Sequence, residues 1–446
     1  MRSVEPWALA YGALVAAAAA AVLHAAQGQG VPWPWLAVWG LEFALLARLP
    51  WWPLAGLSAY AAMQYGISSH GGVHDQLLSV RGPDAVLVLA LVGWVLFRRP
   101  SDQALWRPRA VWISGALLLV WAGISLGSAL AQGGQWGPFP RHDPSAFLQC
   151  AAVFLMAADT LRTRSAGLAM AGILVLVVAS RAALQGAQGL YLESYIATLA
   201  VMTAPVAALG AWLLPGSRWR WLFAVAMPGL LALVALTQNR AAAVAALVGL
   251  LAGLGLWLSA QVRRWSLWLA CVMAVLALAW WLGQGGRFRA LVDPAAVYAT
   301  SDLDRATAQE RLALWRAGWD MARKAPWLGT GPGNYPAHLQ YMQPGSEPLA
   351  AHSSYVQILA ETGFPGLLLY LLFFLQLIVV LARCAREAPP SSWTRPVAQM
   401  LVLSLVAYLA GGLFNSRHDL ALAYLLAGWG CAVAGRTDAL GAGRPA

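Results

Sequence analysis

His352 stands in a spacing that could support proton transfer beside a membrane. Nine residues separate the pair His352-Ser353 from Gly363-Phe364-Pro365-Gly366, and a long apolar stretch follows. The charge of a histidine changes near neutral pH, so its ring can accept a proton from a hydroxyl group. The pattern predicts that His352 is a general base; the alternative is a capping or interface histidine. His338 and the pair Arg417-His418 are the other candidate proton carriers.

Three arginines are candidates for contacting an anionic group. Arg181 and Arg240 lie at the ends of apolar stretches, and Arg311 lies in the long polar segment before His352. A guanidinium stays charged at neutral pH and offers a planar pair of donors to phosphate or carboxylate. An arginine at the mouth of an apolar span is costly and usually marks a function or a paired site.

A glycine turn follows Arg311 and reads Gly329-Thr330-Gly331-Pro332-Gly333-Asn334-Tyr335. Glycines let backbone N–H groups approach an anion closely, although many such turns are purely structural. Both interpretations stay open on the sequence. The candidate substrate-binding residues of this segment are Gly331, Gly333, Tyr335 and His338.

The sequence predicts neither a metal site nor a cofactor. The triplet Asp302-Leu303-Asp304 supplies two carboxylates, which are few for a divalent cation, and helix capping explains it as well. All four cysteines fall in or beside apolar stretches, which argues against a disulfide framework and a zinc site. A nucleotide-binding P-loop does not appear in the sequence.

The composition is that of an integral membrane protein. Of 446 residues, 60% are hydrophobic and 11% are charged, whereas soluble domains carry roughly 25% charged residues. The net charge of +11 comes from short basic clusters between apolar runs. That distribution is typical of orientation signals rather than of nucleic-acid binding.

The apolar stretches predict an all-α polytopic protein with about 12, or up to about 14, transmembrane helices. The candidate spans lie near residues 6–27, 33–49, 52–69, 83–98, 110–131, 145–162, 166–183, 190–214, 219–237, 240–260, 265–284, 362–383, 397–414 and 418–435. Basic clusters occur at every second junction, which places both termini in the cytoplasm. His352 and the three candidate arginines then lie on the outer side.

One long outer loop, residues 285–351, precedes the last three spans. It is expected to contain a surface helix over 306–324, whose apolar stripe comprises Leu312, Trp315, Trp319 and Ala322. The predicted organisation is a transmembrane bundle (1–284), a loop and catalytic region (285–361), the last three spans (362–435) and a cytoplasmic tail (436–446).

These motifs resemble the O-antigen ligase and polymerase superfamily. His352-Ser353, the nine-residue gap and Gly363–Gly366 match the ligase motif at every defined position, and residues 326–333 are also similar. Thr237-Gln238-Asn239-Arg240 resembles the arginine motif of the family. The longer family motif has Leu four residues after an arginine, where this chain has Val244 after Arg240 and Trp315 after Arg311.

The resemblance implies a GT-C-like glycosyltransferase in the bacterial inner membrane, with its active site on the periplasmic face. It would transfer O-antigen from undecaprenyl diphosphate to lipid A-core without metal, ATP or nucleic acid. His352 would activate the acceptor hydroxyl, and Arg240, Arg311 and Arg181 would bind the diphosphate. One base and direct displacement imply inversion, while a covalent route through Glu310 or Glu361 stays open.

The sequence is also compatible with three other functions. An O-antigen polymerase would use a second lipid-linked glycan as acceptor, but relatives of that kind tend to carry two sizeable outer loops. A protein O-oligosaccharyltransferase is usually longer. A polysaccharide transporter would carry ionisable residues at mid-membrane, whereas the candidate residues here gather on one side.

Overall fold

The computed structural model describes residues 108–131, 146–187, 194–214, 217–236, 240–257, 310–342, 349–389 and 391–441. Five predicted spans lie outside these ranges: 6–27, 33–49, 52–69, 83–98 and 265–284. Every regular element within the described ranges is a helix. The triplet at 302–304 also lies outside them.

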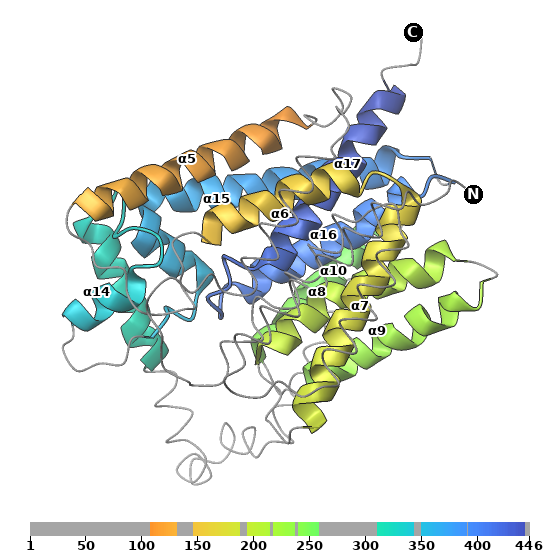
Figure 1. Cartoon of the computed structure of the whole chain (residues 1–446), viewed down its shortest axis with the longest axis horizontal. Helices are drawn as coiled ribbons and strands as arrows, with labels where there is room; N and C mark the ends of the chain where they lie inside the picture. The colour runs from red at the N-terminus through yellow and green to blue at the C-terminus, as the bar shows by residue number, and fades with distance from the viewer. Residues whose placement is uncertain are drawn as a thin grey trace, which may run out of the picture.

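Nine long helices coincide with the nine remaining predicted spans, and a short helix lies between them in the chain (Figure 1). The labelled helices are α5 (Arg109–Ala131), α6 (Ala146–Thr160), α7 (Arg164–Ala187), α8 (Ser194–Leu213), α9 (Trp219–Leu236), α10 (Arg240–Trp257), α14 (Tyr335–Met342), α15 (Ser354–Glu387), α16 (Thr394–Gly411) and α17 (Ala421–Gly441). Residues 310–324 form a further helix.

Several of these helices are suited to a bilayer. By length and composition, four helices of the described part could cross a membrane, in α5, α8, α15 and α16, and others are shorter but apolar. α5 exposes Val120 at 59% and Ile113 at 59% of their surface. Exposed side chains of this kind face hydrocarbon at no cost in a membrane protein, so the fold supports the membrane assignment.

α17 lies at the centre of the bundle, and its packing depends on small residues. A Cβ on Gly428 would lie 2.3 Å from the carbonyl oxygen of Phe154 in α6, and one on Gly167 would lie 2.7 Å from the ring of Trp429. Without those methyl groups the helices approach closely, as is common among membrane helices. Trp429 is completely buried as a result.

α15 is kinked near its N-terminal end. Gly363 has φ 72° and ψ −176°, and this conformation separates residues 354–362 from the long apolar part of the helix. The predicted span began at residue 362, so its start coincides with the kink. The apolar pattern predicted no helix for 354–361, because Ser354, Gln357 and Glu361 interrupt it.

The helix at 310–324 confirms part of the surface-helix prediction, but its buried face only partly coincides with the predicted stripe. Leu314, Ala317, Met321 and Ala322 are buried, so Ala322 of the predicted stripe lies on the buried face and Trp315 is partly buried, whereas Leu312 and Trp319 are 48% and 49% exposed. Small residues explain the choice: a Cβ on Gly318 would lie 2.5 Å from Val356. The helix therefore packs against α15 through its small face and leaves large apolar side chains outside.

Candidate functional site

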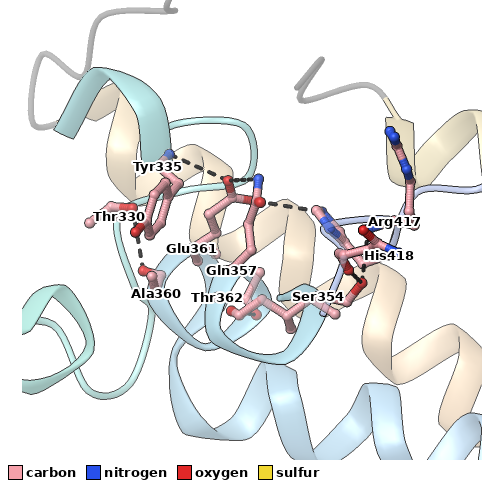
Figure 2. A network of polar contacts seen from close by, with 12 residues as sticks. Thr330, Tyr335, Ser354, Gln357, Ala360, Glu361, Thr362, Arg417 and His418 are labelled. Carbon is pink, nitrogen blue, oxygen red and sulfur yellow. Dashed lines mark hydrogen bonds and ion pairs between the residues drawn. The ribbon is translucent and has the colours of Figure 1, made fainter. Parts of the chain in front are cut away.

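The candidate site is built around the first turns of α15, which lie between two connecting segments (Figure 2). On one side are residues 326–335, which include the glycine turn Gly329–Tyr335. On the other is the connection between α16 and α17, residues 412–420, called here the 412–420 loop. Figure 1 shows α14 at the same end of the bundle, which is the end predicted to be the outer one.

The glycine turn docks onto the kink of α15 through backbone hydrogen bonds. The N–H groups of Thr330 and Gly331 donate to the carbonyls of Ala360 and Glu361 at 2.9 and 2.8 Å. Gly329, Gly331 and Gly333 have φ values of 66°, 94° and 79°, which favour glycine. The amide of Gly331 is thus engaged within the protein, and the turn fixes the backbone of Glu361.

Glu361 is enclosed between the two segments, with 1% of its surface exposed. Its Oε1 accepts hydrogen bonds from Gln357 Nε2 at 3.0 Å and from the backbone N–H of Tyr335 at 3.3 Å. Its Oε2 lies 3.8 Å from Nε2 of His418. A buried carboxylate is tolerated only with such partners, and Figure 2 shows them converging on it.

Tyr335 belongs to the interior of this assembly. Its ring is fully buried, and its hydroxyl donates to the carbonyl of Leu314 at 2.6 Å. Burial, together with the Glu361 charge, raises the pKa of the phenol. Tyr335 joins the helix at 310–324, α14 and α15.

The 412–420 loop is attached to α15 through Ser354. Ser354 Oγ donates to the carbonyl of Asn415 at 2.7 Å and accepts from the N–H of Arg417 at 2.8 Å. The N–H of Ser354 donates to the carbonyl of Gly412 at 2.8 Å. These bonds hold Arg417 and His418 close to His352 and Ser353, the two residues that precede α15.

His352 lies just before α15 and is only partly exposed. Its φ of 52° makes it the one non-glycine residue with positive φ in the described part of the chain. A strained backbone of this kind occurs most often at functional sites. Desolvation, followed by the charges of Arg311 and Arg417, lowers the pKa of its imidazole, while Glu310 opposes them. The neutral ring, which can accept a proton, is therefore favoured.

The structure brings some predicted residues together and not others. Arg311 shares the electrostatic environment of His352. His338 lies on α14, where desolvation and the charge of Lys324 lower its pKa. Arg181 lies in α7 and Arg240 is the first residue of α10, but the described side chains include neither. Their predicted contacts stay predictions.

Sequence reasoning treated Arg417 only as part of a rival proton carrier and missed its place beside His352. The available signal was an arginine in a short connection between two predicted spans. Within the described residues, no cluster of three or more His, Cys, Asp or Glu side chains could hold a metal ion. The chemistry open to this arrangement is proton abstraction next to fixed positive charge.

Comparison with known proteins agrees with the motifs. Residues 225–371 match the family model described as O-antigen ligase. The matched stretch includes α10, the glycine turn, His352 and the kink of α15. A search of curated proteins found no match.

Proposed function

Residues 225–371 belong to the O-antigen ligase family, and on this premise we propose that the protein transfers an O-antigen polysaccharide from undecaprenyl diphosphate to lipid A-core. The family indicates a glycosyltransferase-like membrane enzyme that uses lipid-linked polysaccharides. The observation that carries the proposal is the setting of His352: a positive-φ histidine, with a lowered pKa, beside Arg311.

The reaction begins with deprotonation of the acceptor. A sugar hydroxyl is a poor nucleophile, so a base must take its proton as the new bond to the anomeric carbon forms. His352 is neutral near pH 7 because burial and neighbouring arginines lower its pKa. The ring receives the hydroxyl proton and becomes the imidazolium.

The bond between the anomeric carbon and the diphosphate breaks in the same displacement, and negative charge grows on the leaving diphosphate. A guanidinium stabilises such charge with paired hydrogen bonds. Arg311 supplies it in the proposal, with Arg240 and Arg181 as further contacts. The donor linkage supplies the driving force, so we expect turnover without ATP or metal.

Of the two carboxylates considered for a covalent route, Glu361 is disfavoured by its burial, whereas Glu310 is exposed and its charge acts on His352. Glu361 is held by Gln357, Tyr335 and His418, with 1% of its surface exposed. A covalent glycosyl-enzyme needs a carboxylate that can reach the anomeric carbon. Glu361 does not meet this requirement in the described arrangement.

The test is reconstitution with purified protein. The protein in nanodiscs receives undecaprenyl-diphosphate glycan and lipid A-core with EDTA and no nucleotide, and we expect glycosylated lipid A-core. His352→Gln should reduce turnover by roughly 100-fold or more, with an unchanged thermal unfolding midpoint. Full activity in His352→Gln would overturn the base assignment.

The same assay separates the ligase from the polymerase. A polymerase would lengthen the glycan on undecaprenyl diphosphate and leave lipid A-core unmodified. Formation of that product alone would replace our proposal, and loss of all turnover with EDTA would show a metal requirement.

A further inference from the structure

We propose that Arg417 is an additional diphosphate-binding residue, and that the buried pair of Glu361 and His418 positions it. The inference rests on the proposed function, because it assigns Arg417 to the same donor. It adds a residue from the last connection of the chain, outside the family-matched stretch 225–371.

The backbone of Arg417 is fixed relative to His352. Its N–H donates to Ser354 Oγ at 2.8 Å, and its carbonyl accepts from the hydroxyl of Tyr408 at 2.9 Å. Ser354 is the first residue of α15 and follows His352 by two positions. A shift of the 412–420 loop would break both hydrogen bonds, so Arg417 and His352 keep one relative placement.

The neighbouring residue, His418, is directed into the protein. It is 4% exposed, its Nε2 lies 3.8 Å from Glu361 Oε2, and its carbonyl accepts from Tyr424 Oη at 3.1 Å. Its ring lies 5.8 Å from that of Phe147. His418 Nδ1 is buried without a hydrogen-bond partner in the described structure, which leaves Glu361 as the polar group that orients the ring.

The side chains of His418 and Arg417 point in different directions. In Figure 2 the side chain of His418 turns toward Glu361, whereas the side chain of Arg417 extends away from the polar network. Arg417 is partly exposed, in contrast to its buried neighbour. His418 therefore anchors the loop to Glu361, and the adjacent Arg417 extends its side chain away from the network.

The charge around His352 suits an anion. The charges of Arg311 and Arg417 both act on the imidazole, and the carboxylate of Glu310 opposes them. Two guanidiniums contributed by different segments can contact different phosphates of one diphosphate. As the sugar leaves, charge on the diphosphate increases and the attraction to both strengthens.

Binding of undecaprenyl diphosphate tests the assignment directly. Full-length protein in nanodiscs is titrated with this lipid, which is the expected product, and the Kd is measured. Arg417→Gln should raise the Kd roughly 10- to 100-fold, and Arg417→Lys should restore part of the affinity because it keeps the charge without the fork. The matched control is Arg386→Gln, an exposed arginine at the opposite end of α15, which should leave the Kd unchanged.

A double-mutant cycle tests the anchor. His418→Phe keeps an aromatic ring of similar volume but removes the contact with Glu361, and it should weaken binding several-fold. If His418 acts by placing Arg417, adding His418→Phe to Arg417→Gln should weaken binding little further. Additive effects would show that His418 only stabilises the fold and would overturn the positioning role.

The outcomes separate this inference from the proposed function. If the wild type binds undecaprenyl diphosphate through Arg417 but transfers no glycan to lipid A-core, the inference stands and the ligase proposal fails. If the wild type transfers glycan and Arg417→Gln has a wild-type Kd, the inference fails alone. Absence of binding by the wild type overturns the inference.

Discussion

The two segments that flank the first turns of α15 are attached in different ways. The glycine turn docks through its backbone: amides of Thr330 and Gly331 meet carbonyls of α15, and Gly329 lies where a Cβ would be 2.3 Å from Glu361. The 412–420 loop is held by Ser354 of α15, whose N–H and hydroxyl bond backbone groups of the loop, and by the side chain of His418, which contacts Glu361. Both hold the same helix end.

This difference suggests a structural role for the glycine turn and a ligand-binding role for the 412–420 loop. Gly329 approaches Glu361 too closely for a Cβ, so this part of the glycine turn has no room for a side chain and fixes the kink and Glu361. The backbone bonds of the 412–420 loop to Ser354 involve residues that keep their side chains, and there Arg417 lies beside an anchored His418. We therefore expect substitutions in the first segment to affect folding, and those in the second to affect binding more than stability.

The largest effect should come from Gly363→Ala, at the kink that receives the glycine turn. Gly363 has φ 72°, and a Cβ there would lie 2.3 Å from the carbonyl oxygen of Trp327. Strain and the clash together should destabilise the fold by about 3 kcal/mol or more. Thermal unfolding and size-exclusion chromatography in detergent measure it. Gly123→Ala in α5, where a Cβ meets nothing within 4 Å, should not destabilise.

Glu361→Ala should have the next largest effect, because Glu361 contacts both segments. Its loss removes the acceptor used by Gln357 and by the N–H of Tyr335, and the contact to His418. Leaving buried donors without an acceptor costs about 2–4 kcal/mol, which the thermal unfolding midpoint should report. Glu361→Gln keeps an amide oxygen at this position and should lose less. Equal losses in both variants would contradict the hydrogen-bonding explanation.

Ser354→Ala should loosen the 412–420 loop with a smaller cost. It removes the bonds to the carbonyl of Asn415 and the N–H of Arg417, which together are worth about 1–2 kcal/mol. Hydrogen exchange should increase in residues 412–420 and stay unchanged in the glycine turn. Ser165→Ala, an exposed serine, is the control. An equal increase in hydrogen exchange in both segments would show that the two segments are not independent.

The smallest effect is a pH shift. Because burial and the charges of Arg311 and Arg417 lower the pKa of His352, kcat/KM for transfer should rise with pH to a plateau, with its midpoint below the ordinary histidine value. Arg311→Gln removes one positive charge, so the protonated ring is less disfavoured and the midpoint should move up by about 0.3–1 pH unit. A midpoint that stays fixed or moves down would exclude direct coupling between the two residues.

The positions of the helices could be predicted from the sequence. Apolar stretches long enough for a bilayer reveal membrane helices, and the nine that fall in the described residues coincide with α5 to α10 and α15 to α17. The buried face of the helix at 310–324 could not be predicted in the same way. There, Gly318 allows close approach to Val356, and close approach outweighs the large apolar stripe that periodicity selects.

The candidate site, too, was predictable only in part from the sequence. His352 could be identified from its motif and Arg311 from its place in the loop, since both signals are local in sequence. The tertiary structure alone decided that Arg417 lies beside His352 and that Glu361 faces His418. Periodicity carries no information on which helix ends meet, because that depends on how small residues such as Gly428 let the helices pack. The sequence thus determined the membrane class, the helices of the described residues and the candidate base His352, and packing determined which charges act on it.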